Sequence, residues 1–192
     1  MPLYSTIPIS LLGISSNTPS AVLFPVALGT ASGFITRTSV STWYPTLKKP
    51  AYEPPRWAFP VAWTYLYASM GYASHLLAES IQRTSILEKA EMASTALELY
   101  YIQLGLNMLW TPLFFGFKKP GMALIEIIGL SSTVFWMTNI SRKVNMKAFY
   151  LFLPYCAWLS YATYLNAGIW YLNGGKQKLS KLFKKSVQPK QD

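Results

Sequence analysis

The sequence is poor in the residues that build metal sites, disulfides and a water-facing surface. Among 192 residues it has one cysteine, Cys156, and one histidine, His75, and only 12% of its residues are charged. One cysteine excludes a disulfide scaffold, and with one histidine it leaves no cluster for a zinc or iron site. Soluble domains carry about 25% charged residues. Because 52% of the residues are hydrophobic, disorder is excluded as well, and the composition indicates a membrane protein.

Long uncharged stretches separate the few charges. Four of them, 1–36, 57–78, 99–117 and 148–175, contain no Asp, Glu, Lys or Arg, and 120–141 contains only one, Glu126. A helix needs about 20 mostly apolar residues to cross a hydrocarbon layer of about 30 Å. We therefore predict an all-α membrane protein, a five-transmembrane-helix bundle with spans at about 20–38, 57–78, 96–117, 121–141 and 147–172.

The segments outside the predicted spans suggest an orientation. Residues 1–19 are expected to be an N-terminal extension, loosely ordered, and 174–192 a basic tail. The side that holds the 39–56 loop, the 118–120 turn and the tail carries 12 of the 17 Lys and Arg residues. The positive-inside rule places this side in the cytosol. Because the lysines flank spans and do not line one folded face, no nucleic-acid partner is expected, whereas the tail can contact anionic lipid.

The first loop differs from an ordinary linker. Residues 43–63 read WYPTLKKPAYEPPRWAFPVAW, with five Trp or Tyr residues and five prolines. Each aromatic ring alone is typical of a membrane interface. Together, rings braced by prolines with fixed φ favour an ordered segment. We expect the 39–56 loop to be a lid over a cavity between the helix ends.

Four segments carry a family resemblance. WYPTLKKPAYEPPRW and AWTYLYASMGYAS resemble the first loop and second helix of the TspO/tryptophan-rich sensory protein family, also called translocator protein or peripheral-type benzodiazepine receptor. YIQLGLNMLWTPLFFGFKKPGMALIEIIGL is similar to its third and fourth helices, and PYCAWLSYATYLNAGIWYLN to its fifth. The resemblance covers about residues 20–173 and implies a five-helix bundle whose first loop closes a pocket.

The resemblance also implies ligands and a location. Family members bind porphyrins and, in animals, cholesterol and certain drugs, and several bacterial members promote light- and oxygen-dependent breakdown of protoporphyrin IX. Animal members reside mainly in the outer mitochondrial membrane; the endoplasmic reticulum is the alternative here. The expected ligand is a porphyrin, protoporphyrin IX or haem, with no required cofactor. Where animal members place the Tyr and Arg of a sterol motif, this chain has Ala167 and Tyr171.

Matching the motifs position by position implies a set of ligand-binding residues. Stacking on flat apolar ligands suits the aromatic members, and the amides suit orientation of a polar edge. Each also has a structural interpretation, as a packing ring or as a hydrogen bond between helices. The implied residues are Gly33, Tyr44, Trp63, Asn107, Trp158, Ala162 and Asn166.

Binding is the leading function, as a receptor or carrier of porphyrins, sterols or similar apolar ligands. The alternative is an enzyme-like, light-dependent degradation of the porphyrin, with Trp63 and Trp158 as redox-active rings. Glu126 inside a span is a functional hypothesis by default, equally open to structural pairing or a neutral carboxyl. His75 can ligate haem iron, although a lone imidazole more often packs. A homodimer is expected, with Gly71 and Gly105 permitting close helix contact.

Overall fold

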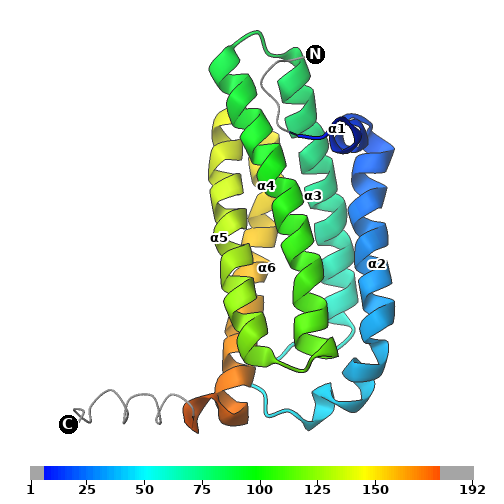
Figure 1. Ribbon diagram of the computed structural model, residues 1–192, viewed down its shortest axis with the longest axis vertical. Helices are drawn as coiled ribbons and strands as arrows, with labels where there is room; N and C mark the ends of the chain where they lie inside the picture. Colours follow the sequence, from blue (N-terminus) through cyan, green and yellow to red (C-terminus); the bar gives the residue numbers. More distant parts are fainter. Residues whose placement is uncertain (1–6, 178–192) are drawn as a thin grey trace, which may run out of the picture.

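The computed structural model describes residues 7–177, apart from the side chain of residue 35, and shows a bundle of long helices (Figure 1). Each long helix has 25 or 26 residues, about 37 Å at 1.5 Å per residue. They are α2 (Thr18–Thr42), α3 (Ala58–Arg83), α4 (Leu87–Thr111), α5 (Pro120–Val144) and α6 (Met146–Trp170). The shorter elements are α1 (Ile9–Ser16), η1 (Tyr44–Thr46), η2 (Pro112–Gly116) and η3 (Tyr171–Gly175). The all-α class predicted from the sequence is confirmed.

Each predicted span overlaps one of the long helices. Within the described residues, α5 alone is a single helix whose length and hydropathy suit a membrane span. Helix α1 and residues 18–34 of α2 meet the same criteria when they are taken together, as a pair bent by 107°. Taken singly, the other long helices do not reach that hydropathy. That all five helices cross the bilayer therefore stays a prediction.

The bundle exposes many large apolar side chains on its outer surface and buries several polar side chains beside its apolar core. Leu23, Ile125 and Trp136 are 63%, 75% and 59% exposed on the outer surface. Gln103 and Asn107 are buried within the bundle. Lipid tolerates an apolar outer surface, and buried polar groups need partners when no water is present. The distribution suits the membrane class.

Helix α3 contacts most of the other helices. It packs against α2, α4 and α6, and the remaining main contacts are α4 with α5 and α5 with α6. Gly71 permits the α2–α3 contact, because a Cβ at this position would overlap the Ala21 carbonyl oxygen of α2. Gly71 is thus used inside the chain and is not available for the dimer contact expected from the sequence. Gly105 has open space beside it among the described residues.

The N-terminal extension is more ordered than expected. Residues 9–16 form α1, which lies against α3 next to the start of α2 (Figure 1). Hydrogen bonds hold it in place: the Tyr101 hydroxyl donates to the Leu11 carbonyl (2.7 Å) and lies 2.7 Å from the Ser15 hydroxyl. Such long-range bonds have no local sequence signal, which explains the difference.

The predicted 39–56 loop begins inside a helix, since α2 continues to Thr42. After η1 the chain crosses the end of the bundle opposite α1 and reaches α3 (Figure 1). Asn173 holds this crossing on both sides of Lys48: its amide donates to the Lys48 carbonyl (2.7 Å) and accepts from the Lys48 N–H (3.0 Å). The basic tail lies largely outside the described residues, which end at 177.

Candidate functional site

Trp63 and Trp158 meet in an aromatic cluster between α3 and α6. Their ring centroids lie 6.3 Å apart, edge to face, and Trp63 also stacks on Tyr67 at 5.4 Å. Tyr155 approaches Trp63 edge-on at 6.3 Å. On α3, Phe59, Trp63 and Tyr67 follow the i, i+4 spacing that places side chains on one helix face. This spacing is a sequence signal that could have identified the α3 part of the cluster. Matching family motifs did not include Phe59, Tyr67 and Tyr155 among the expected site residues.

A groove of about 400 Å³ lies beside this cluster, on the face between α3 and α6. Small side chains at facing positions, Ala62 and Ala157, leave the space, and Pro154 contributes a helix position without an N–H. Trp158 forms one wall, and its Nε1–H is buried with no hydrogen-bond partner in the described part of the chain. The lining residues are Ala62, Tyr65, Leu66, Pro154, Ala157, Trp158 and Tyr161.

The position of this groove differs from the expected cavity. Because the Trp63 and Trp158 rings contact each other directly, the space between them is filled. The open volume lies outside the pair, on the flank of the bundle, and reaches the 39–56 loop only where Tyr161 hydrogen-bonds to it. The groove is therefore beside the loop and not enclosed beneath it.

Tyr44 lies in a separate aromatic cluster at the loop end of the bundle. Its ring packs near Phe114 and Phe115, whose ring centroids lie 6.4 and 5.8 Å from that of Tyr44. The Lys49 Nζ lies over the Tyr44 ring, 4.4 Å from its centroid. Lys49 also pairs with Glu53 at 2.9 Å. Burial and the nearby Glu53 carboxylate raise the pKa of the Tyr44 hydroxyl. Tyr44 stabilises the loop entry in this structure.

The two predicted amides are engaged in bonds between helices. Asn107 Oδ1 accepts from the Tyr67 hydroxyl (2.6 Å), and its Nδ2 donates to the Tyr155 hydroxyl (2.9 Å). Asn166 Oδ1 accepts from Trp110 Nε1 (3.0 Å), and its Nδ2 donates to the Pro120 carbonyl (2.8 Å). Asn107 therefore ties α3, α4 and α6 together, and Asn166 fastens α6 to the ends of α4 and α5.

The two small predicted residues lie in different places. Ala162 is one turn beyond Trp158 on α6 and packs against the main hydrophobic core. Gly33 lies on an exposed part of α2, and within the described residues no other element comes within 4 Å of where its Cβ would be. The structure thus brings Trp63, Trp158 and Ala162 together and leaves Gly33 apart.

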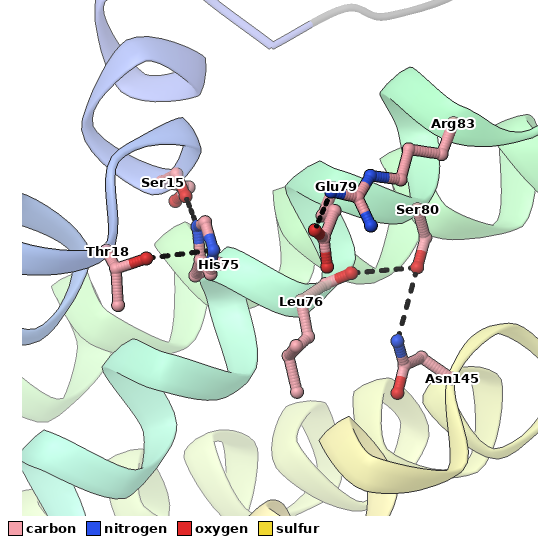
Figure 2. Close-up of polar contacts among 8 residues, drawn as sticks. All are labelled: Ser15, Thr18, His75, Leu76, Glu79, Ser80, Arg83 and Asn145. Atoms are coloured by element: carbon pink, nitrogen blue, oxygen red, sulfur yellow. Dashed lines mark hydrogen bonds and ion pairs between the residues drawn. The ribbon is translucent and has the colours of Figure 1, made fainter.

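The histidine at the other end of the bundle is a structural contact (Figure 2). His75 Nδ1 donates to the Ser15 carbonyl at 2.9 Å, and Nε2 lies 3.0 Å from the Thr18 hydroxyl. Because both ring nitrogens contact the α1–α2 segment, haem ligation would require one of these bonds to break. Figure 2 also shows the Glu79–Arg83 ion pair at 2.8 Å on the same helix.

Glu126 is the charged residue inside the predicted span 121–141. Both its carboxylate oxygens are buried and have no hydrogen-bond partner among the described residues. Of the interpretations left open by the sequence, a structural pairing is not seen among the described residues. A carboxylate in this setting is costly unless it is protonated.

Comparison with known proteins identifies the family. The model of the TspO/MBR family matches residues 21–172. The chain belongs to the TspO/MBR family. It is 36% identical over 154 residues to the tryptophan-rich protein TspO of Archaeoglobus fulgidus, covering 80% of this chain and 95% of that one.

Relatives from eukaryotes match over a similar region. The translocator protein homolog of Schizosaccharomyces pombe is 39% identical over 162 residues, 83% of this chain and 94% of that protein. The human translocator protein is 37% identical over 133 residues, 69% of this chain and 76% of its own length. The chain is therefore a membrane protein of the TspO/MBR family, and α1 lies outside the region that the family model matches.

Proposed function

We propose that this TspO/MBR protein is a membrane receptor or carrier that binds flat apolar ligands, tetrapyrroles first and sterols second, in the α3–α6 groove. The observation that carries the proposal is the position of Trp158. One side of this residue forms the groove wall, and the other packs into the aromatic cluster. A flat ring laid on Trp158 gains about 0.5–1.5 kcal/mol from stacking beyond the area that it buries.

Other features favour the same class of ligand. The groove is open to the apolar flank of the bundle, where ligands dissolved in the bilayer arrive. The Trp158 Nε1–H, which has no partner in the described part, is a donor for an acceptor on the ligand once side chains shift. The names of the relatives, translocator protein among them, support transport or reception of a small molecule over a purely structural role.

Fluorescence quenching in detergent tests this proposal. Purified protein titrated with protoporphyrin IX in the dark should lose tryptophan fluorescence in a saturable manner. Trp158→Phe should weaken binding roughly threefold or more, since an indole wall and its N–H are lost. Trp136→Phe is the matched control, because Trp136 is exposed on α5 and away from the groove. Equal affinity of Trp158→Phe and Trp136→Phe would place the ligand elsewhere.

The alternative function is light- and oxygen-dependent degradation of bound protoporphyrin IX. The observation in its favour is the unbroken ring contact from Trp158 through Trp63 to Tyr67, since adjacent oxidisable rings can pass an electron hole away from a photo-excited ligand. Illumination in oxygen should then consume porphyrin faster on this protein than on serum albumin carrying the same amount. Equal rates would leave binding as the function.

We further propose that the C-terminus and the 39–56 loop face the cytosol, in the outer mitochondrial membrane or, as the alternative, the endoplasmic reticulum. The asymmetry of Lys and Arg supports this orientation. Protease added to intact organelles should remove the tail after Gly175 while leaving α1 intact. Loss of α1 with retention of the tail would reverse the orientation.

A further inference from the structure

Two tyrosines of α6 hold the first loop by its backbone. The Tyr161 hydroxyl donates to the Tyr52 carbonyl at 2.5 Å, and the Tyr164 hydroxyl donates to the Ala51 carbonyl at 3.0 Å. The two rings stack at 6.4 Å with an angle of 21° between their planes. Successive carbonyls of the loop are therefore fixed by hydroxyls that lie about one helical turn apart.

The same part of the loop packs closely on α6. A Cβ at Gly168 would lie 2.6 Å from the Pro50 Cβ, so only glycine lets the Pro50 ring rest on the helix. Tyr52 itself has a positive φ of 64°, a left-handed conformation that is uncommon for a residue with a side chain. The tyrosine bonds help to hold this less favourable backbone, together with the Asn173 bonds to Lys48.

Tyr161 belongs to the groove as well as to the loop contact. Its ring lines the groove and lies 5.8 Å from the Trp158 ring. Tyr164 bonds the loop in the same way but does not line the groove. A ligand placed on Trp158 would therefore contact the ring of Tyr161, whose hydroxyl donates to the Tyr52 carbonyl of the loop. It would not contact Tyr164, which lies outside the groove lining.

We propose that Tyr161 is a positioning residue that couples occupancy of the groove to closure of the loop. A ligand packed on its ring restricts the side chain to the orientation in which the hydroxyl reaches the Tyr52 carbonyl, so binding tightens the loop. Because coupling between two sites is reciprocal, release of the loop weakens ligand binding by the same factor. This inference rests on the proposed binding function and assigns its regulation to one side chain.

Trypsin digestion without ligand tests the loop contact alone. Lys48 and Arg56 are cleavage sites in the loop. A net hydrogen bond is worth about 0.5–1.5 kcal/mol, so Tyr161→Phe and Tyr164→Phe should each speed loop cleavage about threefold to tenfold. Tyr150→Phe is the control, because Tyr150 is exposed on α6 and lies outside the groove and the loop contact. Wild-type cleavage rates in Tyr161→Phe would overturn the proposal.

Digestion with ligand tests the coupling. Saturating protoporphyrin IX in the dark, or cholesterol in a parallel series, should slow loop cleavage at least threefold in the wild type, Tyr150→Phe and Tyr164→Phe. In Tyr161→Phe protoporphyrin IX should still quench tryptophan fluorescence but no longer slow cleavage. A full ligand effect in Tyr161→Phe would overturn the coupling. Absence of both porphyrin quenching and equilibrium cholesterol binding in the wild type would instead overturn the binding function and the coupling with it. The ligand-free series would still decide the loop contact.

Discussion

The Asn107 amide gives the sharpest test of how the bundle is held together. Asn107→Leu keeps the size of the side chain and removes its polarity. The Tyr67 hydroxyl then loses the acceptor at 2.6 Å, and the Tyr155 hydroxyl loses the donor at 2.9 Å. Tyr155 still donates to Gln103 Oε1 at 2.8 Å. Two hydrogen bonds between helices are therefore lost, and one buried hydroxyl loses the acceptor that it has in the structure.

The size of the effect follows from these contacts. A side-chain hydrogen bond between membrane helices is worth about 0.6 kcal/mol on average and about 1.7 at most. Two lost bonds, with a buried hydroxyl left unsatisfied, predict a decrease of about 1–3 kcal/mol in the free energy of unfolding. Because the amide is occupied by Tyr67 and Tyr155, porphyrin affinity should change less than twofold.

Unfolding in mixed detergent micelles measures the first quantity, and fluorescence quenching measures the second. Tyr67→Phe and the double variant complete a thermodynamic cycle, whose coupling energy should be about 0.5–1 kcal/mol. Strict additivity of the two changes would refute the bond. A large loss of affinity with unchanged stability would show that Asn107 contacts the ligand, as the family resemblance implies.

The loop, the buried carboxylate and α1 each give a further testable outcome. Gly168→Ala should displace the Pro50 ring and speed tryptic cleavage of the loop at least threefold, whereas Gly105→Ala, with open space beside it, should not; equal rates would contradict the close packing. Glu126→Leu should raise the free energy of unfolding by about 1–3 kcal/mol, because a buried carboxyl with no hydrogen-bond partner among the described residues is replaced by an apolar group; a decrease would reveal a partner. Tyr101→Phe should speed amide hydrogen exchange across residues 9–16 about threefold to tenfold, and unchanged exchange would mean that α1 is held by other contacts.

The helices could be predicted closely because charge-free stretches and helix length are both local properties. The ends were less predictable. Helix α3 continues to Arg83 and α4 begins at Leu87, several residues beyond the predicted spans. Glu79 and Glu88 limit an apolar stretch but are good helix formers. Hydropathy therefore marks where apolar character ends, while the backbone hydrogen bonds continue.

The site was predictable only in part. The resemblance placed Trp63 and Trp158 in the same site, and the structure brings their rings into contact. The groove depends on Ala62 facing Ala157 across two helices, a register that no single stretch of sequence specifies. The structural roles of the amides could not be predicted for the same reason, because the hydrogen bonds of Asn107 and Asn166 join residues 40 to 56 positions apart in the sequence.

Binding of a flat apolar ligand in the groove between α3 and α6 is the proposal on which the other functional predictions depend. The most direct measurement is equilibrium binding of protoporphyrin IX to the protein in lipid nanodiscs, with Ala157→Trp filling the groove. Leu153→Trp is the matched control, because Leu153 is exposed on the same helix but outside the groove. We expect at least a tenfold loss of affinity for Ala157→Trp and none for Leu153→Trp. Unchanged affinity in Ala157→Trp would show that the ligand does not bind in this groove.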